Sequence, residues 1–239
     1  MNHQLTVIET GQLDYLESWD LQKDLARARR EGTIPDTLLL TEHPPTYTIG
    51  RRGSRKNLLI DSATLEGIGA RCYEVDRGGD ITFHGPGQLV AYLIMDLGRA
   101  ERGLRRFVGN LEATVIGTLE AYGIPGAPAE GKPGVWVNGR KIAAVGVAVS
   151  RRVTYHGFAL NVNPDLSYFD HMIPCGIPGS GATSIERELG HSVDLTDVVD
   201  RVVEQLAARF AAEPVRGVRL EDLPGDAIRI SERVSSIHD

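Results

Sequence analysis

The sequence predicts one mixed α/β domain of the α+β type, in which a mixed β-sheet is flanked by helices. Strand-like and helix-like patterns alternate along the 239 residues without a break in composition. No internal repeat or low-complexity linker divides the chain. With 41% hydrophobic and 24% charged residues, the composition is that of a globular protein long enough to bury a core without disulfides.

The first third of the chain begins with a predicted amphipathic helix over residues 11–31. Its leucines follow helical spacing, and the Glu31-Gly32 pair is typical of a helix end. Short apolar runs predict strands at 37–41 and 47–49, which the His43-Pro44-Pro45 break separates. A further strand is expected at 71–75.

The middle of the chain predicts a strand, a helix and a hairpin. The apolar run at 89–95 indicates a buried strand, and residues 104–119 place their apolar side chains on one face of a long helix. Asn138-Gly139 is a dipeptide preferred in two-residue hairpin turns, because both positions accept a positive φ. It is expected to join a strand at 134–137 to a strand at 141–150.

The last third predicts one more strand, a long loop and two helices. Residues 153–162 form the strand, and the loop at 163–182 is long enough to suggest a functional role. Thr183-Ser184-Ile185-Glu186 matches a capping box that opens a short helix, and apolar spacing over 198–210 marks the last helix. We therefore expect a catalytic domain over residues 1–215 and a C-terminal extension over 216–239.

Charge and hydropathy limit the classes of function. The net charge of −6 argues against general nucleic-acid binding, although basic residues cluster around Arg51–Lys56 and could steer an acidic protein partner. The sequence contains no apolar stretch of membrane-spanning length and no secretory signal pattern. These features predict a cytoplasmic protein that binds neither membrane nor nucleic acid.

The glycine-rich segment at 77–88 is the most informative feature of the chain. It reads RGGDITFHGPGQ, and glycine both widens the backbone conformations and removes side chains that would keep a ligand away. A turn between strands is the alternative interpretation. It does not explain the polar side chains of His84 and Gln88, so we expect a bound small molecule or acyl group here.

The two cysteines lie far apart and in no metal-ligand spacing, so no metal site is predicted. Cys72 stands in a strand-like stretch and is expected to be structural. Cys175 stands in MIPCGIPG, without the periodicity that would bury it, and is predicted to be reactive. A thiolate at neutral pH needs a nearby cation or base, for which Lys141, His84 and His156 are candidates. Each of the three also has a purely structural interpretation, as a strand-end lysine in water or as a histidine that hydrogen-bonds within the fold.

Several segments together resemble the lipoyl(octanoyl) transferase family. Residues 77–92 agree with that family's signature of RGGxxT, an aromatic residue and His, followed by Gln and Tyr. EHPPTYTIGRR at 42–52, GRKIAAVGVAVSR at 139–151, the strand at 154–162 and IPCGI at 173–177 extend the resemblance. It covers most of the chain from about residue 38 to residue 189, and it implies a fold like the catalytic domain of biotin and lipoate protein ligases.

The resemblance implies transfer of an octanoyl group from octanoyl-acyl carrier protein to a lysine of an apo lipoyl domain. The acceptors would be the lipoyl domains of 2-oxoacid dehydrogenase E2 subunits and the glycine cleavage H protein, and the enzyme would be a monomer without cofactors. Cys175 would carry the acyl thioester, with Lys141 as its acid and base. By the same resemblance the acyl chain lies against Arg77, Gly78, Gly79, Asp80, Ile81, Thr82, Phe83, His84, Ala144, Val145, Gly146, Gly157, Phe158 and Ala159.

Three alternatives stay open at this level. The shared fold and the arginine-glycine loop at 50–55 also suit an ATP-dependent lipoate or biotin ligase. A non-catalytic protein that only binds lipoyl domains or acyl carriers would keep the same surface. A cysteine hydrolase with His84 as its base would release free fatty acid without an acceptor protein.

Overall fold

A large mixed sheet forms the centre of the computed structural model, which describes residues 3–98, 103–173, 181–224 and 227–228. Within these residues the sheet has eight strands in the order β11-β1-β2-β6-β10-β9-β8-β7. β1 pairs in parallel with β11 and β2, and the other neighbours are antiparallel. The strands are β1 (His3–Gln12), β2 (Asp36–Glu42), β6 (Gln88–Ile94), β7 (Ala127–Ala129), β8 (Lys132–Val137), β9 (Arg140–Ser150), β10 (Val153–Asn161) and β11 (Ala212–Val215).

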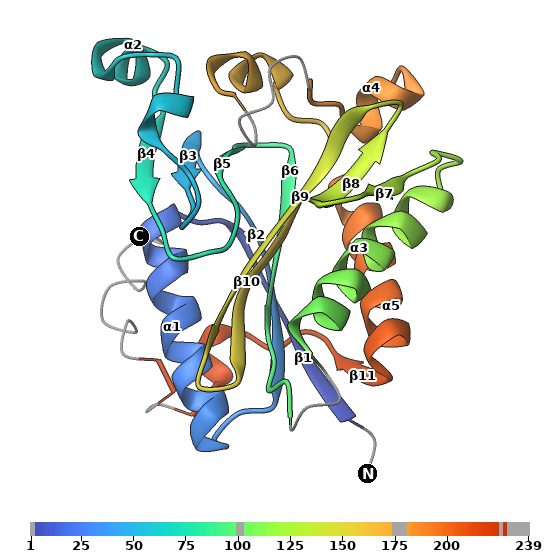
Figure 1. Cartoon of the computed structure of the whole chain (residues 1–239). Helices are drawn as coiled ribbons and strands as arrows, with labels where there is room; N and C mark the ends of the chain where they lie inside the picture. Colours follow the sequence, from blue (N-terminus) through green and yellow to red (C-terminus); the bar gives the residue numbers. More distant parts are fainter. Residues whose placement is uncertain (1–2, 99–102, 174–180, 225–226, 229–239) are drawn as a thin grey trace.

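A small second sheet lies beside one end of the large one (Figure 1). Its order is β4 (Arg71–Glu74), β3 (Thr46–Ile49) and β5 (Ile81–His84), with β3 parallel to β4 and antiparallel to β5. Its own apolar cluster includes the rings of Tyr47 and Phe83. Phe83 stacks on Tyr168 of the 3₁₀ turn η2 (Leu166–His171), which ties this sheet to the loop after β10.

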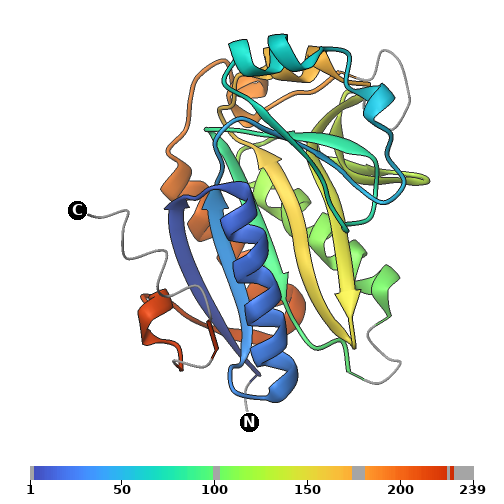
Figure 2. The same cartoon turned by 90° about the vertical axis from the view of Figure 1, so that its left-hand side faces the viewer.

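Helices cover both faces of the large sheet (Figures 1 and 2). α1 (Tyr15–Glu31) packs on one face, whereas α3 (Leu104–Glu120) and α5 (Leu195–Phe210) pack on the other. Asp14 caps the start of α1, where its side chain accepts a hydrogen bond from the N–H of Leu16, and Gly32, with a φ of +79°, caps the end of the helix. The short elements α2 (Ser62–Gly67), α4 (Ile185–Leu189), η1 (Arg55–Asn57) and η4 (Leu220–Asp222) lie in the connections.

Strand alternation assigns the side chains of β10 to the two faces. Phe158 and Leu160 belong to the core under α3 and α5. The side chains of Ala159 and Asn161 therefore point to the face that carries α1.

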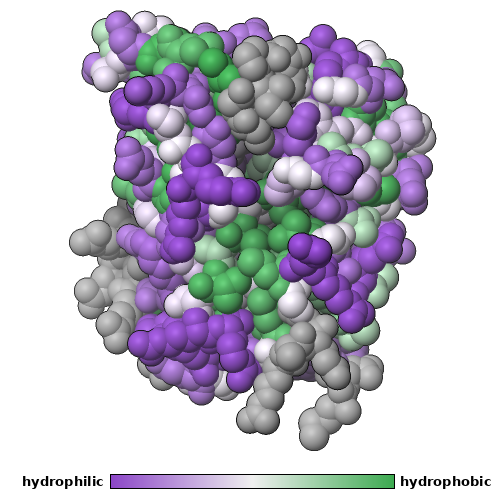
Figure 3. All heavy atoms as spheres, viewed as in Figure 1, coloured by the Kyte–Doolittle hydropathy of each residue, from purple (hydrophilic) through white to green (hydrophobic). Residues whose placement is uncertain are grey.

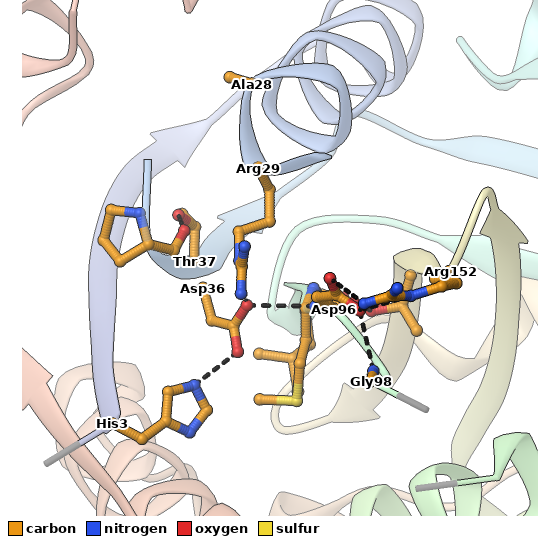
Figure 4. A network of polar contacts seen from close by, with 12 residues as sticks. His3, Ala28, Arg29, Asp36, Thr37, Asp96, Gly98 and Arg152 are labelled. Carbon is orange, nitrogen blue, oxygen red and sulfur yellow. Dashed lines mark hydrogen bonds and ion pairs between the residues drawn. The ribbon is translucent and has the colours of Figure 1, made fainter. Parts of the chain in front are cut away.

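A network of polar contacts surrounds the buried carboxylate of Asp36, at the end of the large sheet that lies away from the small sheet (Figure 4). The side chain of Asp36 is 1% exposed and accepts hydrogen bonds from Arg29, from His3 and from the N–H of Asp96. Asp96 in turn pairs with Arg152 in the turn between β9 and β10. These bonds hold α1, β1, β2 and the far ends of β6 and β10 together, so the strands that reach the small sheet are anchored at their other ends.

The predicted fold class is confirmed, and the structure differs from the expectations in several elements. The chain forms β1 before its first helix, so that helix begins at Tyr15 rather than at residue 11. The cap of α4 is Ser184, which accepts from the N–H of Arg187, one residue after the predicted position. The long loop after β10 contains η2, and β11 adds an edge strand to the large sheet.

Two of the described residues after β11 pack into the core. Ala227 and Ile228 are buried in the apolar cluster beneath α1.

Figure 3 shows that the face drawn there is mostly hydrophilic, with apolar surface gathered near its middle, over β9 and its neighbours. Across the described parts of the chain, no helix is both long and apolar enough to cross a bilayer.

Candidate functional site

A cavity of about 850 Å³ lies between the two sheets and holds most of the predicted site. Its walls come from the Arg77–Gln88 segment, from β9 and β10, and from the turn between β7 and β8. Leu59, Phe169, Met172 and Ile173 complete it on the side of η2. The cavity thus combines apolar walls with polar groups, as binding sites for small molecules and cofactors do.

Lys141 is the cation that β9 brings into this cavity. Its Nζ donates a hydrogen bond to the carbonyl oxygen of Pro133 at 3.3 Å and lies 4.8 Å from the centre of the Trp136 ring. The backbone of Lys141 is held by Gly181 and Thr183, through N–H to O=C distances of 3.0 and 2.9 Å. The amine is therefore partly buried on a fixed strand rather than extended into water.

Cys175 lies outside the described residues, in the segment 174–180. Both residues that flank this segment, Ile173 and Gly181, line the cavity. Ile173 is held by the carbonyl oxygen of Asn57 at 2.8 Å, and Gly181 accepts from Lys141. The two ends of the segment are thus fixed at the cavity, and one of them is bonded directly to the strand of Lys141.

The glycines of the Arg77–Gln88 segment serve close contacts within the protein. Gly79 has a φ of +92°, a conformation that favours glycine. A Cβ on Gly146 would come within 2.8 Å of the carbonyl oxygen of Gly78, and the N–H of Gly78 donates to Val147 at 2.9 Å. The N–H of Gly78 is therefore already used and is not a free oxyanion donor.

The predicted substrate-contacting residues fall into three groups. Those that line the large cavity are Arg77, Gly79, Asp80, Ile81, Thr82, Ala144, Val145 and Ala159. Those found only in a smaller adjoining cavity are His84, Gly146, Gly157 and Phe158. Gly78 and Phe83 line neither; the ring of Phe83 belongs to the apolar cluster of the small sheet.

His84 is a hydrogen-bonding element of the fold. Its Nδ1 lies 2.9 Å from Oε1 of Gln88, and its Nε2 lies 3.2 Å from Oγ1 of Thr48. Because Nε2 of Gln88 donates elsewhere, its Oε1 accepts the Nδ1 proton of His84, and the Thr48 hydroxyl donates to Nε2. Burial lowers the pKa of His84 well below its ordinary value, so the ring is neutral. With both nitrogens engaged, His84 is poorly suited to act as the base of a hydrolase.

A polar relay connects His84 to the strand of Lys141, and sequence analysis missed it. Nε2 of Gln88 donates to Oδ1 of Asn161 at 2.9 Å, and Nδ2 of Asn161 donates to the carbonyl oxygen of Thr183 at 2.9 Å. The N–H of Thr183 is bonded to Lys141. Gln88 and Asn161 are almost fully buried, so the relay fixes the position of Lys141 relative to the Arg77–Gln88 segment. The only signal in the sequence was a polar side chain within an otherwise apolar strand.

We expect an Asn161→Leu variant to lose about 10- to 100-fold in activity, because a small shift of reacting groups is costly. Leucine keeps the volume but removes both hydrogen bonds that reach Gln88 and Thr183. The matched control is Asn163→Leu, since Asn163 also makes two hydrogen bonds, both to the backbone of Val193. Steady-state transfer rates and melting temperatures of both variants separate positioning from stability. Equal losses in both variants would assign Asn161 a purely structural role.

A second polar cluster surrounds Asp76 near the N-terminal part of α1. Asp76 accepts hydrogen bonds from His156 at 2.9 Å, from Trp19 at 3.1 Å and from the hydroxyl of Tyr155. Partial burial raises the pKa of Asp76, but the hydrogen bonds from His156 and Tyr155 outweigh it and lower the pKa to about 2. Burial lowers the pKa of His156, so the neutral ring donates through Nε2.

Among the residues that the structure describes, no group of three or more His, Cys, Asp or Glu side chains is placed to hold a metal ion.

Sequence comparison places the chain among known proteins. Residues 14–207 match the family model for the lipoyl protein ligase A/B catalytic domain. An octanoyltransferase of Chloroflexus aggregans is 45% identical over 217 residues, which are 90% of this chain and 98% of the relative. An octanoyltransferase of Rubrobacter xylanophilus is 50% identical over 195 residues, 81% of this chain and 87% of the relative.

Solved structures of lipoate protein ligases share the fold. A lipoate-protein ligase A bound with ATP superposes with a TM-score of 0.72 at 15% identity, covering 98% of this chain and 95% of that chain. A chain from the structure of a bi-partite lipoate protein ligase and its E2 lipoyl domain from Thermoplasma acidophilum gives 0.72 at 14% identity, with coverages of 98% and 93%. At these identities the likeness concerns the fold alone, whereas the sequence relatives define the family. The chain belongs to the lipoyl protein ligase A/B catalytic-domain family and, within it, to the octanoyltransferases.

Proposed function

We propose that this chain transfers an octanoyl group from octanoyl-acyl carrier protein to a lysine of an apo lipoyl domain, through a thioester on Cys175. One observation carries the proposal: Lys141 lies in the cavity whose lining includes both residues that flank the segment of Cys175. Cys175 follows Ile173 by two residues, and two trans peptide units span at most about 7.6 Å between Cα atoms. The sulfur is therefore within reach of the cavity that holds the amine.

In the first half-reaction the ammonium of Lys141 favours the thiolate of Cys175. The thiolate attacks the carbonyl carbon of the octanoyl thioester, and a new carbon–sulfur bond forms to Cys175. When the tetrahedral intermediate collapses, the bond to the phosphopantetheine sulfur breaks. Lys141 gives its proton to the departing thiol and becomes neutral.

In the second half-reaction the acceptor lysine attacks the acyl-enzyme. Neutral Lys141 takes the proton that the attacking amine loses, the amide bond forms, and the thiolate of Cys175 leaves. Enzyme and Lys141 return to their starting states, so one residue serves as acid and then as base. Because a thioester is exchanged for an amide, the transfer is downhill and needs no nucleotide.

The cavity walls suit an acyl chain. Ala144 and Ala159 face each other across β9 and β10, and both line the large cavity. Their small side chains leave an apolar slot along this wall of the cavity, which Lys141 also lines. Burial of the chain is worth about 0.8 kcal/mol per methylene, so this slot contributes several kcal/mol to substrate binding.

The exposed basic residues beside the cavity suit an acidic carrier protein. Arg52 lines the cavity, and Arg51, Arg55 and Lys56 are exposed next to it. A carrier that delivers its thioester here would meet a positively charged rim, which favours fast association at low salt. The acceptor lipoyl domain would have to enter by the same opening, after the carrier leaves.

The proposal is tested with purified chain, octanoyl-acyl carrier protein and an apo lipoyl domain, in the presence and absence of ATP and Mg²⁺. We expect the lipoyl domain to gain an octanoyl group without ATP, and free octanoate with ATP to give no product. Product formed only from free octanoate and ATP would indicate the ligase reaction instead. Release of free octanoate without an acceptor would indicate a hydrolase.

A further inference from the structure

Lys141 faces the large cavity because β9 carries a bulge. Val135 of β8 pairs with Ala143 of β9. The next residue along β8, Trp136, already pairs with Lys141, so β9 has one extra residue at this point. That residue, Ile142, is buried in the same core as Ala143. Regular alternation from Ala143 would turn Lys141 into the core, whereas the bulge returns its side chain to the cavity.

Three residues of β8 hold the side chain of Lys141. Nζ donates to the carbonyl oxygen of Pro133 at 3.3 Å and lies 4.8 Å from the centre of the Trp136 ring. Gly134 has a φ of +124°, and a Cβ there would lie 3.4 Å from Cε of Lys141. The N–H of Gly134 donates to Glu112 of α3 at 2.9 Å, which fixes this part of β8. We call Pro133, Gly134 and Trp136 the lysine cradle.

The Trp136 ring contacts Lys141 and lies apart from the apolar core. Val135 and Val137 belong to the core under α3 and α5, so the Trp136 side chain between them points to the opposite face of the sheet. The residue is 9% exposed, yet it belongs to none of the three apolar clusters of the described residues. It lines neither cavity, so it is placed to act through Lys141 rather than on a substrate.

The lysine cradle favours the charged form of the amine. An ammonium group is attracted to the face of an indole ring, whereas a neutral amine is not. Its hydrogen bond to a carbonyl oxygen is also stronger when the donor is charged. Partial burial acts in the opposite direction, because a charged group loses solvation. The ring and the carbonyl oxygen therefore offset the cost of placing a cation in the cavity.

Other charged side chains also act on the amine of Lys141. Those that line the same cavity are Arg52, Arg77, Asp80, Glu130, Lys132 and Asp170. Lys132 also lies over the Trp136 ring, at 5.7 Å from its centre. Glu112 bonds to the lysine cradle from α3, and Glu188 of α4 pairs with Arg140 beside Lys141. An alteration confined to the indole ring leaves all of these groups in place, so the effect of the ring can be measured by itself.

We propose that Trp136 is a positioning residue for acyl transfer, whose ring holds the amine of Lys141 at the cavity in its charged form. This inference rests on the proposed function, because Trp136 acts through the acid and base of that reaction. The first half-reaction uses Lys141 as an ammonium, whereas the second uses it as a neutral amine. A ring that stabilises the ammonium therefore assists the first step and not the second.

The test weakens the attraction of the ring for a cation and keeps the shape of the ring. The chain has two tryptophans, so fluorinated tryptophan incorporated into a Trp19→Phe background alters Trp136 alone. Rapid-quench mass spectrometry then gives the rate of each half-reaction as a function of pH. With 5,6-difluorotryptophan, Lys141 loses its proton more readily, so the alkaline limb of the first step should move to lower pH by about 0.5 unit. The second step should change by less than about 2-fold.

A second series changes the ring by substitution. Trp136→Phe keeps a smaller ring and should slow the first step at neutral pH by about 3-fold, whereas Trp136→Leu removes the ring and should slow it by about 10- to 30-fold. The matched control is Trp19→Leu, because Trp19 also lies under a lysine amine, that of Lys23 at 3.8 Å, and lines neither cavity. Its first step should keep the rate and the pH profile of the wild type.

Two results would overturn the inference. One is an alkaline limb that stays in place in the fluorotryptophan protein, or a wild-type first step in folded Trp136→Leu. The other is an equal loss in both half-reactions at every pH in the fluorotryptophan protein, which would assign the ring a purely structural role. A wild type that transfers no octanoyl group at any pH would instead refute the proposed function.

Discussion

Replacement of Lys141 by methionine is expected to lower octanoyl transfer by about 10³-fold or more, because one amine serves both half-reactions. Methionine keeps the unbranched side chain beside Trp136 but has no charge and no proton to exchange. The thiol of Cys175 would then be mostly protonated at neutral pH. Formation of the acyl-enzyme and its transfer to the lipoyl domain should both slow, as measured by rapid-quench mass spectrometry of each step.

Two further variants sharpen this experiment. Lys141→Arg keeps a positive charge that cannot act as a base, so it should retain more of the first step than of the second. Lys23→Met is the matched control, because Lys23 also lies over a tryptophan ring, at 3.8 Å from Trp19, and lines neither cavity. Near-normal transfer by folded Lys141→Met would remove Lys141 from the mechanism.

Replacement of Ala159 by leucine is expected to abolish the advantage of octanoyl over butyryl donors. Ala159 lines both cavities and lies opposite Ala144, so a larger side chain blocks the slot at its inner end. Octanoyl has four more methylenes than butyryl, and at about 0.8 kcal/mol each their burial is worth about 3 kcal/mol, or about 10²-fold in kcat/KM. The wild type should show this ratio, and Ala159→Leu should bring it close to one.

The ratio of the two donors corrects for any general loss of activity. Ala148→Leu makes the same change in β9 outside both cavities, and melting temperatures show whether either variant is overpacked. A wild-type octanoyl preference that survives in Ala159→Leu would mean that the acyl chain lies elsewhere.

Much of the fold was predictable because its local signals agree with its tertiary structure. The Asn138-Gly139 turn has φ values of 49° and 78°, as a two-residue hairpin turn requires. The expected strands before and after it correspond to β8 and β9. In contrast, β1 and β11 pair in parallel with each other, and their pairing joins segments more than 200 residues apart. No sequence pattern near either strand indicates that the two strands pair with each other.

The candidate site was predictable in part for the same reason. The Arg77–Gln88 segment and Lys141 were singled out from glycine content and from a charged residue in an apolar strand, and they do line one cavity. The polar relay through Gln88 and Asn161 could not be predicted. It is made of single polar side chains from separate elements, which look like ordinary strand positions until the chain is folded.

The central claim is that Cys175 carries the acyl group in a cavity that it shares with Lys141. Intact-mass analysis with peptide mapping, after incubation with octanoyl-acyl carrier protein, tests it most directly. The account predicts one octanoyl adduct on the peptide that contains Cys175, its loss on addition of apo lipoyl domain, and its absence in Cys175→Ala. An adduct on another residue, or normal transfer by Cys175→Ala, would contradict the account.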